Sequence, residues 1–583
     1  MSKFEESNFY KALQDFFINA DKKTFLQFLA EFYNRTEGII DKNNIQDDLI
    51  KDLRELYLEF NEKGIDENIV REKVNYFLEN SLKIKDINSK LNTNTNNIEN
   101  ITSQLNTIAK YNNVINLGKL SLISENVSYN QSTKTYNMTD ISNIIINALA
   151  LDCSTIIFPK GNYLIDNEII IDKPINLIGL GTNIYSSPSS TTKKVFKISS
   201  NNVNIEGFNF YSVKDYNMNL TGATSNSSNI DAIFILGDSS NYITNINIKN
   251  CYGENLSYLI SSMYSKNVSI NNCSCDEVYF PFYSDNSIDI KIDKCNFSGQ
   301  LSTDVYAHVL YFGHETHNAD VTNCILTQNG VDGANIVKCG SNNGSSGNIK
   351  LTDCTLNGIG SSLFYVDTIS VLEIINCKVT WKSKSGYARV LQLINNSVVK
   401  FFNCECEFDG FDRYTQGYDL TNSLIEFSNC TITIKNTIEK YSYLPFVAGC
   451  KMKFDNCTFN ININYSYNLM SPDFLHVEFF NCIFHSNVKL FIGYYDADSV
   501  NYTKTTTPIL KMYNCIFENL SQSAMGVNSL FMNITKDGFT PQCHIVNFVG
   551  YKCSATSGGN SGKLFMTNVE SQYLKNNVID LKP

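Results

Sequence analysis

Carboxylates, histidines and tyrosines gather between residues 283 and 367 of this 583-residue chain. Three of its six histidines lie within residues 304–320, beside Asp304, Glu315 and Asp320. Cleavage of a glycan needs two carboxylates, about 5 Å apart for a retaining mechanism or about 6.5–9.5 Å apart for an inverting one. Tyrosine rings near carboxylates also suit sugars, because ring faces take apolar C–H patches while carboxylates accept hydroxyl hydrogens. The pattern therefore predicts either a sugar-binding surface, which can also be catalytic, or a plain solvated wall with polar side chains.

The spacing of these residues to a set of repeated cysteines selects the candidates. Asp285, His314 and Asp367 each precede such a cysteine by ten residues, so they can approach one another on one wall. The candidate catalytic residues are Asp285, Glu315 and Asp367, and the candidate glycan contacts are Tyr283, Tyr311, His314, Tyr365, Trp381 and Arg389. Trp381 serves either as a sugar platform or as a wall residue, and Arg389 either binds an anionic group bidentately or simply lies on the surface. No Cys-x-x-Cys pair is present, and we expect neither a metal nor a cofactor.

The cysteines belong to a repeat that sets the architecture. An Asn-Cys dipeptide or a near variant recurs eleven times, at intervals of 22 to 33 residues. The cysteines of these dipeptides are Cys251, Cys273, Cys295, Cys324, Cys354, Cys377, Cys404, Cys430, Cys457, Cys482 and Cys515. Around them apolar and polar residues alternate, as in Ile290-Lys291-Ile292, and this period of two predicts strands with one buried face. A repeat of this length without helical periodicity predicts strands that coil and stack on themselves.

Stacked rungs explain both residues of the dipeptide. Equivalent side chains line up along the axis of such a coil, with about 4.8 Å between rungs. Cysteine is small and among the most buried residue types, so we expect a buried column of cysteines rather than zinc ligands or disulfides. Asparagine tolerates a left-handed backbone, so we expect each residue before a cysteine to form a bend.

Residues 139–181 predict how the coil begins. Asp140 can cap a short helix near 139–150 that carries Ile144 and Ala148 and closes the open end of the core. The segment Phe158-Pro159-Lys160-Gly161-Asn162-Tyr163 and a glycine-rich rung at 175–181 follow. This order resembles the start of pectate-lyase-superfamily β-helices, in particular of phage tailspikes, and the looser rung pattern extends the resemblance over about residues 135–560. The resemblance implies a mainly β protein with a right-handed parallel β-helix, here of about 13–15 rungs, but no single chemistry, because this scaffold carries lyases, hydrolases, epimerases and inert adhesins.

The first 135 residues differ in composition from the rest. Apolar stripes, such as the one through Phe9, Leu13 and Phe16, predict either a plain helical bundle or a helical module that docks on a virion. A heptad pattern follows, and its Ile-rich seam favours a trimer. The seam positions are Ile84, Leu91, Ile98 and Leu105, alternating with Ile87, Asn94, Ile101 and Ile108. We expect a helical module at 1–80, a short trimeric coiled coil at 81–112, the β-helix at 113–560 and a C-terminal cap or tail at 561–583.

Bulk properties narrow the function further. The net charge of −11 argues against a nucleic-acid binder, and no apolar run is long enough for a membrane span. The N-terminus lacks a signal-peptide pattern, so we expect assembly in a reducing host cytoplasm.

With the resemblance, this layout predicts a homotrimeric tailspike-type receptor-binding protein of the phage virion. Residues 1–80 would contact tail or collar proteins, and the β-helix would bind host wall teichoic acid or capsular polysaccharide. The alternatives are a polysaccharide depolymerase, either hydrolase or lyase, on the same fold, and a structural spike without its own receptor site.

Overall fold

The structure is a computed structural model that describes part of the chain. The described residues are 114–117, 127–151, 153–189, 192–213, 229–299, 307–329, 334–340, 346–359, 362–367, 370–382, 390–393, 396–409, 423–435, 450–462, 467–468, 476–487, 490–491, 509–519, 542–546, 549–551 and 579–581. The chain divides into two compact units, residues 1–110 and 111–583, and the described residues all belong to the second. The helical module and the coiled coil lie outside the described residues and stay predictions. Within the described part, no helix has the length and apolar character needed to cross a membrane.

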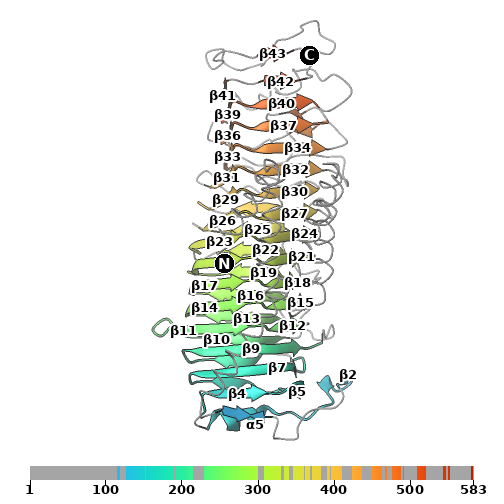
Figure 1. Cartoon of the computed structure of the whole chain (residues 1–583), viewed down its shortest axis with the longest axis vertical. Helices are drawn as coiled ribbons and strands as arrows, with labels where there is room; N and C mark the ends of the chain where they lie inside the picture. The colour runs from blue at the N-terminus through green and yellow to red at the C-terminus, as the bar shows by residue number, and fades with distance from the viewer. Residues whose placement is uncertain are drawn as a thin grey trace, which may run out of the picture. The chain divides into compact units, whose positions relative to one another are not determined.

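The described residues are almost entirely parallel β structure, coiled so that successive turns add strands to three stacks (Figure 1). The first stack joins sixteen strands: β1 (Val114–Asn116), β4 (Thr155–Phe158), β7 (Ile175–Tyr185), β9 (Val203–Tyr211), β11 (Ile243–Lys249), β14 (Ser265–Asn271), β17 (Ile288–Asp293), β20 (His317–Thr322), β23 (Asn348–Thr352), β26 (Val371–Ile375), β29 (Val398–Phe402), β31 (Leu424–Ser428), β33 (Lys451–Asp455), β36 (His476–Phe480), β39 (Ile509–Tyr513) and β41 (Gln542–Val546). The mainly β architecture of parallel strands is thus confirmed. The sixteen strands exceed the upper limit of the expected 13–15 rungs by one. The additional strand is β1, which pairs with β4 ahead of the first rung that the sequence pattern indicates.

The second and third stacks complete the coil. The second contains β5 (Gly161–Leu164), the C-terminal halves of β7 and β9, β12 (Tyr252–Glu254), β15 (Ser274–Val278), β18 (Asn296–Gly299), β21 (Ile325–Gln328), β24 (Thr355–Ile359), β27 (Lys378–Lys382), β30 (Glu405–Asp409), β32 (Thr431–Lys435), β34 (Thr458–Asn462), β37 (Ile483–Ser486), β40 (Ile516–Asn519), β42 (Val549–Tyr551) and β43 (Ile579–Leu581). The third contains β6 (Ile169–Ile171), β8 (Lys193–Ile198), β10 (Ile230–Leu236), β13 (Tyr258–Met263), β16 (Phe280–Asp285), β19 (His308–Phe312), β22 (Asn335–Cys339), β25 (Ser362–Val366) and β28 (Leu391–Leu393). Two short pairs stand apart: antiparallel β2 (Tyr129–Asn130) with β3 (Thr135–Tyr136), and parallel β35 (Tyr467–Asn468) with β38 (Leu490–Phe491).

A left-handed residue turns the chain from the first stack into the second. All eleven residues that precede a repeat cysteine have φ between 52° and 55°, which confirms the predicted bend. Nine are asparagines, and Lys294 and Asp353 replace asparagine in the other two. In β7 and β9 a glycine takes this role instead, at Gly181 and Gly207 with φ of 73° and 79°, where the register between the two strands shifts.

The repeat cysteines line the core directly after this bend. All eleven are buried and free of disulfide bonds, as predicted. The backbone N–H of Cys354 donates to Sγ of Cys377 on the next rung at 3.4 Å, and that of Cys324 donates to Sγ of Cys354 at 3.5 Å. The thiol of Cys377 in turn lies 3.2 Å from the carbonyl oxygen of Ile375. In four pairs of neighbouring rungs the sulfur therefore satisfies a buried backbone N–H that the bend removes from the strand ladder.

Charges alternate in sign along the outer face of the first stack. The middle outward position of nine consecutive rungs carries, in register, Lys291, Asp320, Lys350, Glu373, Lys400, Glu426, Lys453, Glu478 and Lys511. Ion pairs form along this charge ladder between Lys400 and Glu373 at 3.0 Å and between Lys511 and Glu478 at 2.6 Å. Every charge thus has opposite charges about 4.8 Å away along the axis.

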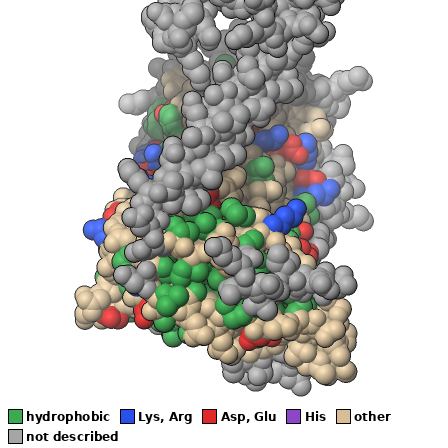
Figure 2. Space-filling view, turned by 60° about the horizontal axis from the view of Figure 1, so that its bottom comes forward, with side chains coloured by type: hydrophobic (Ala, Val, Ile, Leu, Met, Phe, Trp, Pro, Cys, Tyr) green, Lys and Arg blue, Asp and Glu red, His purple; other side chains and the backbone are tan. Residues whose placement is uncertain are grey.

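A short helix, α5 (Ser142–Leu149), covers the N-terminal end of the coil and buries Ile145, Ala148 and Leu149. Asp140 lies one residue ahead of the N-cap position, which Ile141 occupies, and its Oδ1 accepts the Ser142 N–H at 2.9 Å. Ile146 of α5 and Leu151, two residues after its end, are exposed, and apolar side chains gather at this end of the coil (Figure 2).

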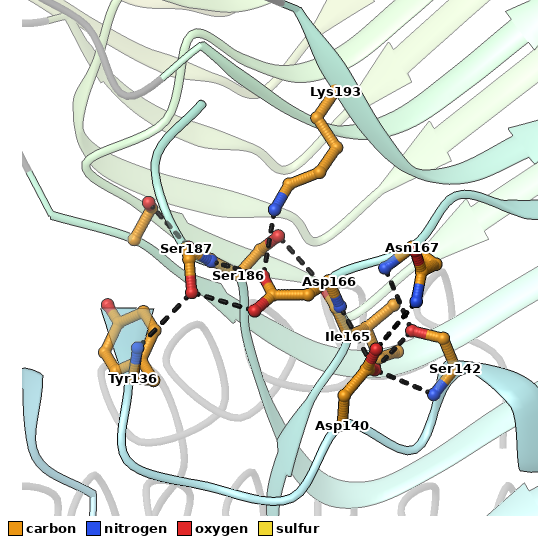
Figure 3. A network of polar contacts seen from close by, with 10 residues as sticks. Tyr136, Asp140, Ser142, Ile165, Asp166, Asn167, Ser186, Ser187 and Lys193 are labelled. Carbon is orange, nitrogen blue, oxygen red and sulfur yellow. Dashed lines mark hydrogen bonds and ion pairs between the residues drawn. The ribbon is translucent and has the colours of Figure 1, made fainter. Parts of the chain in front are cut away.

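A polar network fixes this end to the first rungs (Figure 3). Asn167 donates to Oδ2 of Asp140 at 2.8 Å, and Asp166 accepts bonds from Ser187 and an ion pair from Lys193 at 2.9 Å. The carboxylates of Asp140 and Asp166 therefore connect the helix, the first rung and the third stack.

Candidate functional site

The outward face of the third stack carries most of the candidate residues. Its register aligns Tyr283 of β16 with Tyr311 of β19, Tyr311 with Lys338 of β22, and Lys338 with Tyr365 of β25. The neighbours of these residues along each strand are buried, so the row itself faces outward. The three tyrosines that the sequence placed near one another thus share one row, and Lys338 stands between two of them.

A second row, in which Phe280 and His308 are buried, lies beside the first. Tyr258 of β13 aligns with Phe280 of β16, and their rings stack at 4.9 Å with an interplanar angle of 12°. Tyr283 and Tyr311 meet edge to face at 5.1 Å and 86°. These rings pack in a cluster separate from the main core. We call Tyr258, Phe280, Tyr283, His308, Tyr311, Lys338 and Tyr365 the aromatic wall.

His308 is a buried, neutral member of this wall. Burial lowers its pKa well below the ordinary value, and the nearby Lys338 charge acts in the same direction. The backbone N–H of Asn335 donates to its Nδ1 at 3.2 Å, which places the ring proton on Nε2. His308 therefore contributes a ring and one N–H donor at neutral pH.

Two candidate carboxylates, Asp285 and Asp367, border the wall on a third row. Backbone hydrogen bonds continue the register from Asp285 through Gly313 and Gly340 to Asp367, three rungs away. Three strand spacings amount to about 14 Å, which exceeds the separations of both retaining and inverting pairs. Asp285 and Asp367 are therefore too far apart to act together as one catalytic pair within a single chain.

Asp285 keeps closer neighbours in His314 and Glu315. The carbonyl of His314 accepts the Asn286 N–H at 2.6 Å, so the turn that holds Glu315 lies one rung from Asp285. Burial raises the pKa of Asp285, while the His314 charge and backbone N–H groups oppose the shift. Its Oδ1 is buried without a hydrogen-bond partner among the described residues, whereas Glu315 is exposed at a left-handed position with φ of 45°. One half-buried and one exposed carboxylate thus stand on adjacent rungs.

The remaining candidates do not join this surface. Trp381 lies in β27 of the second stack and is completely buried, so its assignment as a glycan contact is wrong. It aligns with Gly358 of the preceding rung, which leaves room for the indole in the core. Arg389, like Asp304, lies outside the described residues.

Sequence reasoning missed Lys338, His308 and Asp231. Asp231 of β10 aligns with Tyr258 and is nearly fully buried, with an Oδ1 that has no partner among the described residues. Burial raises its pKa to about 8, Lys194 opposes the shift and Glu168 adds to it. The signal in the sequence was the apolar run Ile230–Leu236, in which a lone carboxyl group is costly unless it is protonated or paired. Fold and site together define a parallel β-helix protein with an outward aromatic surface bordered by carboxyl groups.

Comparison with protein-family models gives no match, and comparison with curated proteins gives none either. Among solved structures, the chain is similar to the tailspike protein of E. coli bacteriophage HK620 in complex with a hexasaccharide, at 11% identity over 74% of this chain and 78% of that one, with a TM-score of 0.41. It is similar to the A-module of an Azotobacter vinelandii mannuronan C-5 epimerase, at 11% identity over 69% and 99%, with a TM-score of 0.41. The catalytic domain of a GH87 α-1,3-glucanase matches at 13% identity over 77% and 69%, with a TM-score of 0.33. These likenesses are distant, and the fold of this chain rests on its own strand pairing.

Proposed function

We propose that this protein is a tailspike-type receptor-binding protein that attaches a phage to a host cell-surface glycan, with the aromatic wall as the glycan-binding surface. The single observation that carries the proposal is the outward row of four successive rungs that carry Tyr283, Tyr311, Lys338 and Tyr365 in register. Rungs repeat at about 4.8 Å, so the row offers ring contacts along an extended chain of sugars. The half-buried Asp285 at its border would accept hydroxyl hydrogens, whereas Asp367 is buried.

Binding of the full chain to purified host wall teichoic acid and capsular polysaccharide tests the proposal. Replacing Tyr311 by Ala removes the central ring, and the loss of one stacked ring should weaken binding by about tenfold or more. Phe402→Ala is the matched control, because Phe402 is 43% exposed on the first stack, away from the wall. Equal binding by parent, Tyr311→Ala and Tyr283→Ala would place the receptor site elsewhere or leave a structural spike.

A second candidate function, cleavage of the same glycan, is favoured by Asp285 and Glu315. A half-buried carboxyl with a raised pKa suits a general acid, and an exposed carboxylate on the adjacent rung suits its partner. Release of reducing ends from host glycan would reveal hydrolysis, and an increase in absorbance from unsaturated ends would reveal a lyase. If the enzyme reading holds, Asp285→Asn and Glu315→Gln should each abolish release while the unfolding midpoint stays near that of the parent. Binding without release means an adhesin.

The assembly belongs to the same proposal. Three chains would join through the seam at residues 81–112, and residues 1–80 would attach to tail or collar proteins of the virion. Both segments lie outside the described residues, so their support is the sequence pattern alone.

A further inference from the structure

Lys338 occupies an unusual position for a cation in the aromatic wall. Its Nζ lies 4.8 Å from the ring centroid of Tyr311 and 4.9 Å from that of Tyr365, the residues aligned with it on the two flanking rungs. Burial lowers the pKa of Lys338, and the charge of Asp367 opposes this shift. The ammonium thus sits between two ring faces on an outward row, at a cost in solvation.

The N–H donors of this ammonium are not used within the described part of the chain. Ring faces attract the positive charge but accept no conventional hydrogen bond, and Lys338 makes neither a hydrogen bond through Nζ nor an ion pair with a described residue. Three lysines on the outer faces of the first and second stacks differ. Ion pairs to a carboxylate on the adjacent rung hold Lys400, Lys435 and Lys511, with distances of 3.0, 2.7 and 2.6 Å.

This contrast points to a ligand rather than to packing. A lysine that only stabilised the coil would gain most from a carboxylate on a neighbouring rung, as in the charge ladder. Tyrosines at both neighbouring positions instead keep the charge facing outward and exclude water from its sides, which strengthens its attraction for an anion. The rings beside it remain able to contact the sugar that carries such an anion.

We propose that Lys338 is the recognition point for an acidic group of the bound glycan, either the carboxylate of an acidic sugar or the phosphate of a polyol phosphate chain. The inference rests on the proposed glycan-binding function and specifies its ligand class as anionic. Lysine is a compact point charge with three donors, so it accepts either anion. Asp285, half-buried two rungs away on the bordering row, would contact neutral hydroxyls.

Nuclear magnetic resonance of the full chain with dimethylated lysines tests the inference with defined probes. The Lys338 signal is identified by its loss in Lys338→Arg, and the probes are galacturonate, glycerol phosphate, galactose and glycerol at millimolar concentrations. We expect a saturable shift of the Lys338 signal with one or both anions, none with the neutral compounds, and none at exposed Lys378. The responding anion distinguishes a carboxylate from a phosphate source. No response to either anion, or an equal response to the neutral compounds or at Lys378, overturns the proposal.

Polysaccharide binding separates this inference from the proposed function. Against polygalacturonate, poly(glycerol phosphate) and carboxyl-reduced polygalacturonate, Lys338→Met should weaken binding of the anionic polymer about tenfold and reduce its salt dependence. Lys338→Arg should retain part of the affinity, and Lys378→Met should leave it unchanged. If Lys338→Met binds as the parent does while Tyr311→Ala does not, the wall binds glycan but the anionic assignment is wrong. If Tyr311→Ala also binds as the parent does, the proposed function itself fails.

Discussion

At the scale of single residues, the Asn-Cys dipeptide or its variant solves one geometrical problem on eleven rungs. The first residue takes the left-handed conformation, and the cysteine that follows loses its partner in the strand ladder. A sulfur one rung away then accepts the freed N–H, as Sγ of Cys377 does for Cys354. Valine or alanine would fill the core at this position but would leave the N–H unpaired, which explains why the column consists of cysteine.

Cys377 offers a direct test of this role. Cys377→Ala removes the acceptor of the buried Cys354 N–H and should lower the free energy of unfolding by about 1–3 kcal/mol. Cys377→Ser should cost less, because its hydroxyl keeps both an acceptor for that N–H and a donor toward the carbonyl of Ile375. Chemical denaturation of the three proteins measures the order. If Cys377→Ser lowers the free energy of unfolding as much as Cys377→Ala does, the sulfur stabilises the core by filling space rather than by accepting a hydrogen bond.

Asp231 leads to a pH prediction. Burial raises its pKa to about 8, whereas an unfolded aspartate titrates near 3.9. Between these values the folded state binds more protons than the unfolded state, so this group makes stability fall as pH rises, by up to about 1.4 kcal/mol per pH unit. Asp231→Asn removes this contribution and should stabilise the protein more at about pH 8 than at about pH 5. The measurement is the unfolding midpoint of both proteins at the two pH values, and an equal difference at both would contradict the shifted pKa.

The buried core residues and the left-handed bends could be predicted from the sequence more accurately than the residues of the aromatic wall. Cys377, Val379 and Trp381 lie at every second position, so the strand alternation of β27 already predicts that the tryptophan points inward with the cysteine. Its assignment as a glycan contact considered only the residue type. The alignment of the aromatic-wall residues was mispredicted for another reason. The turns that follow its strands differ in length, two residues after β16 but four after β19, so counting back from the cysteines aligned His314 with Asp285 where the structure aligns Gly313. Strand periodicity survives such insertions, but register between stacks does not.

At the scale of elements, the charge ladder explains how similar rungs find their own neighbours. Successive rungs of the first stack share apolar inward residues, so burial alone distinguishes them weakly. Opposite charges favour adjacent rungs, while skipping one rung would bring like charges together. The ladder is therefore a device against rungs that stack out of order, added to a core that provides most of the stability.

A charge reversal in this ladder tests the idea. Glu373→Lys places a positive charge between Lys350 and Lys400, and the two like-charge contacts should destabilise the protein by about 0.5–2 kcal/mol at low salt. Glu373→Gln is the matched control, because it removes the attraction without adding repulsion. Added salt should bring Glu373→Lys closer to Glu373→Gln, since these side chains are partly exposed. The measurement is the unfolding midpoint of both variants at low and high salt. If Glu373→Lys destabilises the protein no more than Glu373→Gln does, the ladder does not select neighbouring rungs.

At the scale of the whole molecule, the proposed glycan-binding wall would gain from being held in several copies. Linked sites that engage one polymeric glycan raise the effective affinity without any new contact. The heptad pattern of residues 81–112 supplies a means of linkage. It lies outside the described residues, and its trimeric state stays a prediction from the Ile-rich seam.

Light scattering of the full chain tests that prediction, with three times the mass of one chain as the expected result. Ile98 occupies a seam position, so Ile98→Asp would bury three carboxylates at one level of the seam and should shift the population toward smaller species as the protein is diluted. Asn96→Asp adds the same charge at a position that faces away from the seam and should leave the mass unchanged. Glycan-coated surfaces should then release Ile98→Asp much faster than Asn96→Asp, because loss of multivalency increases the overall off-rate while each wall is intact. A parent protein that is cleanly monomeric at micromolar concentration would exclude the trimer, and a trimer that survives Ile98→Asp would show that contacts outside residues 81–112 hold the chains together.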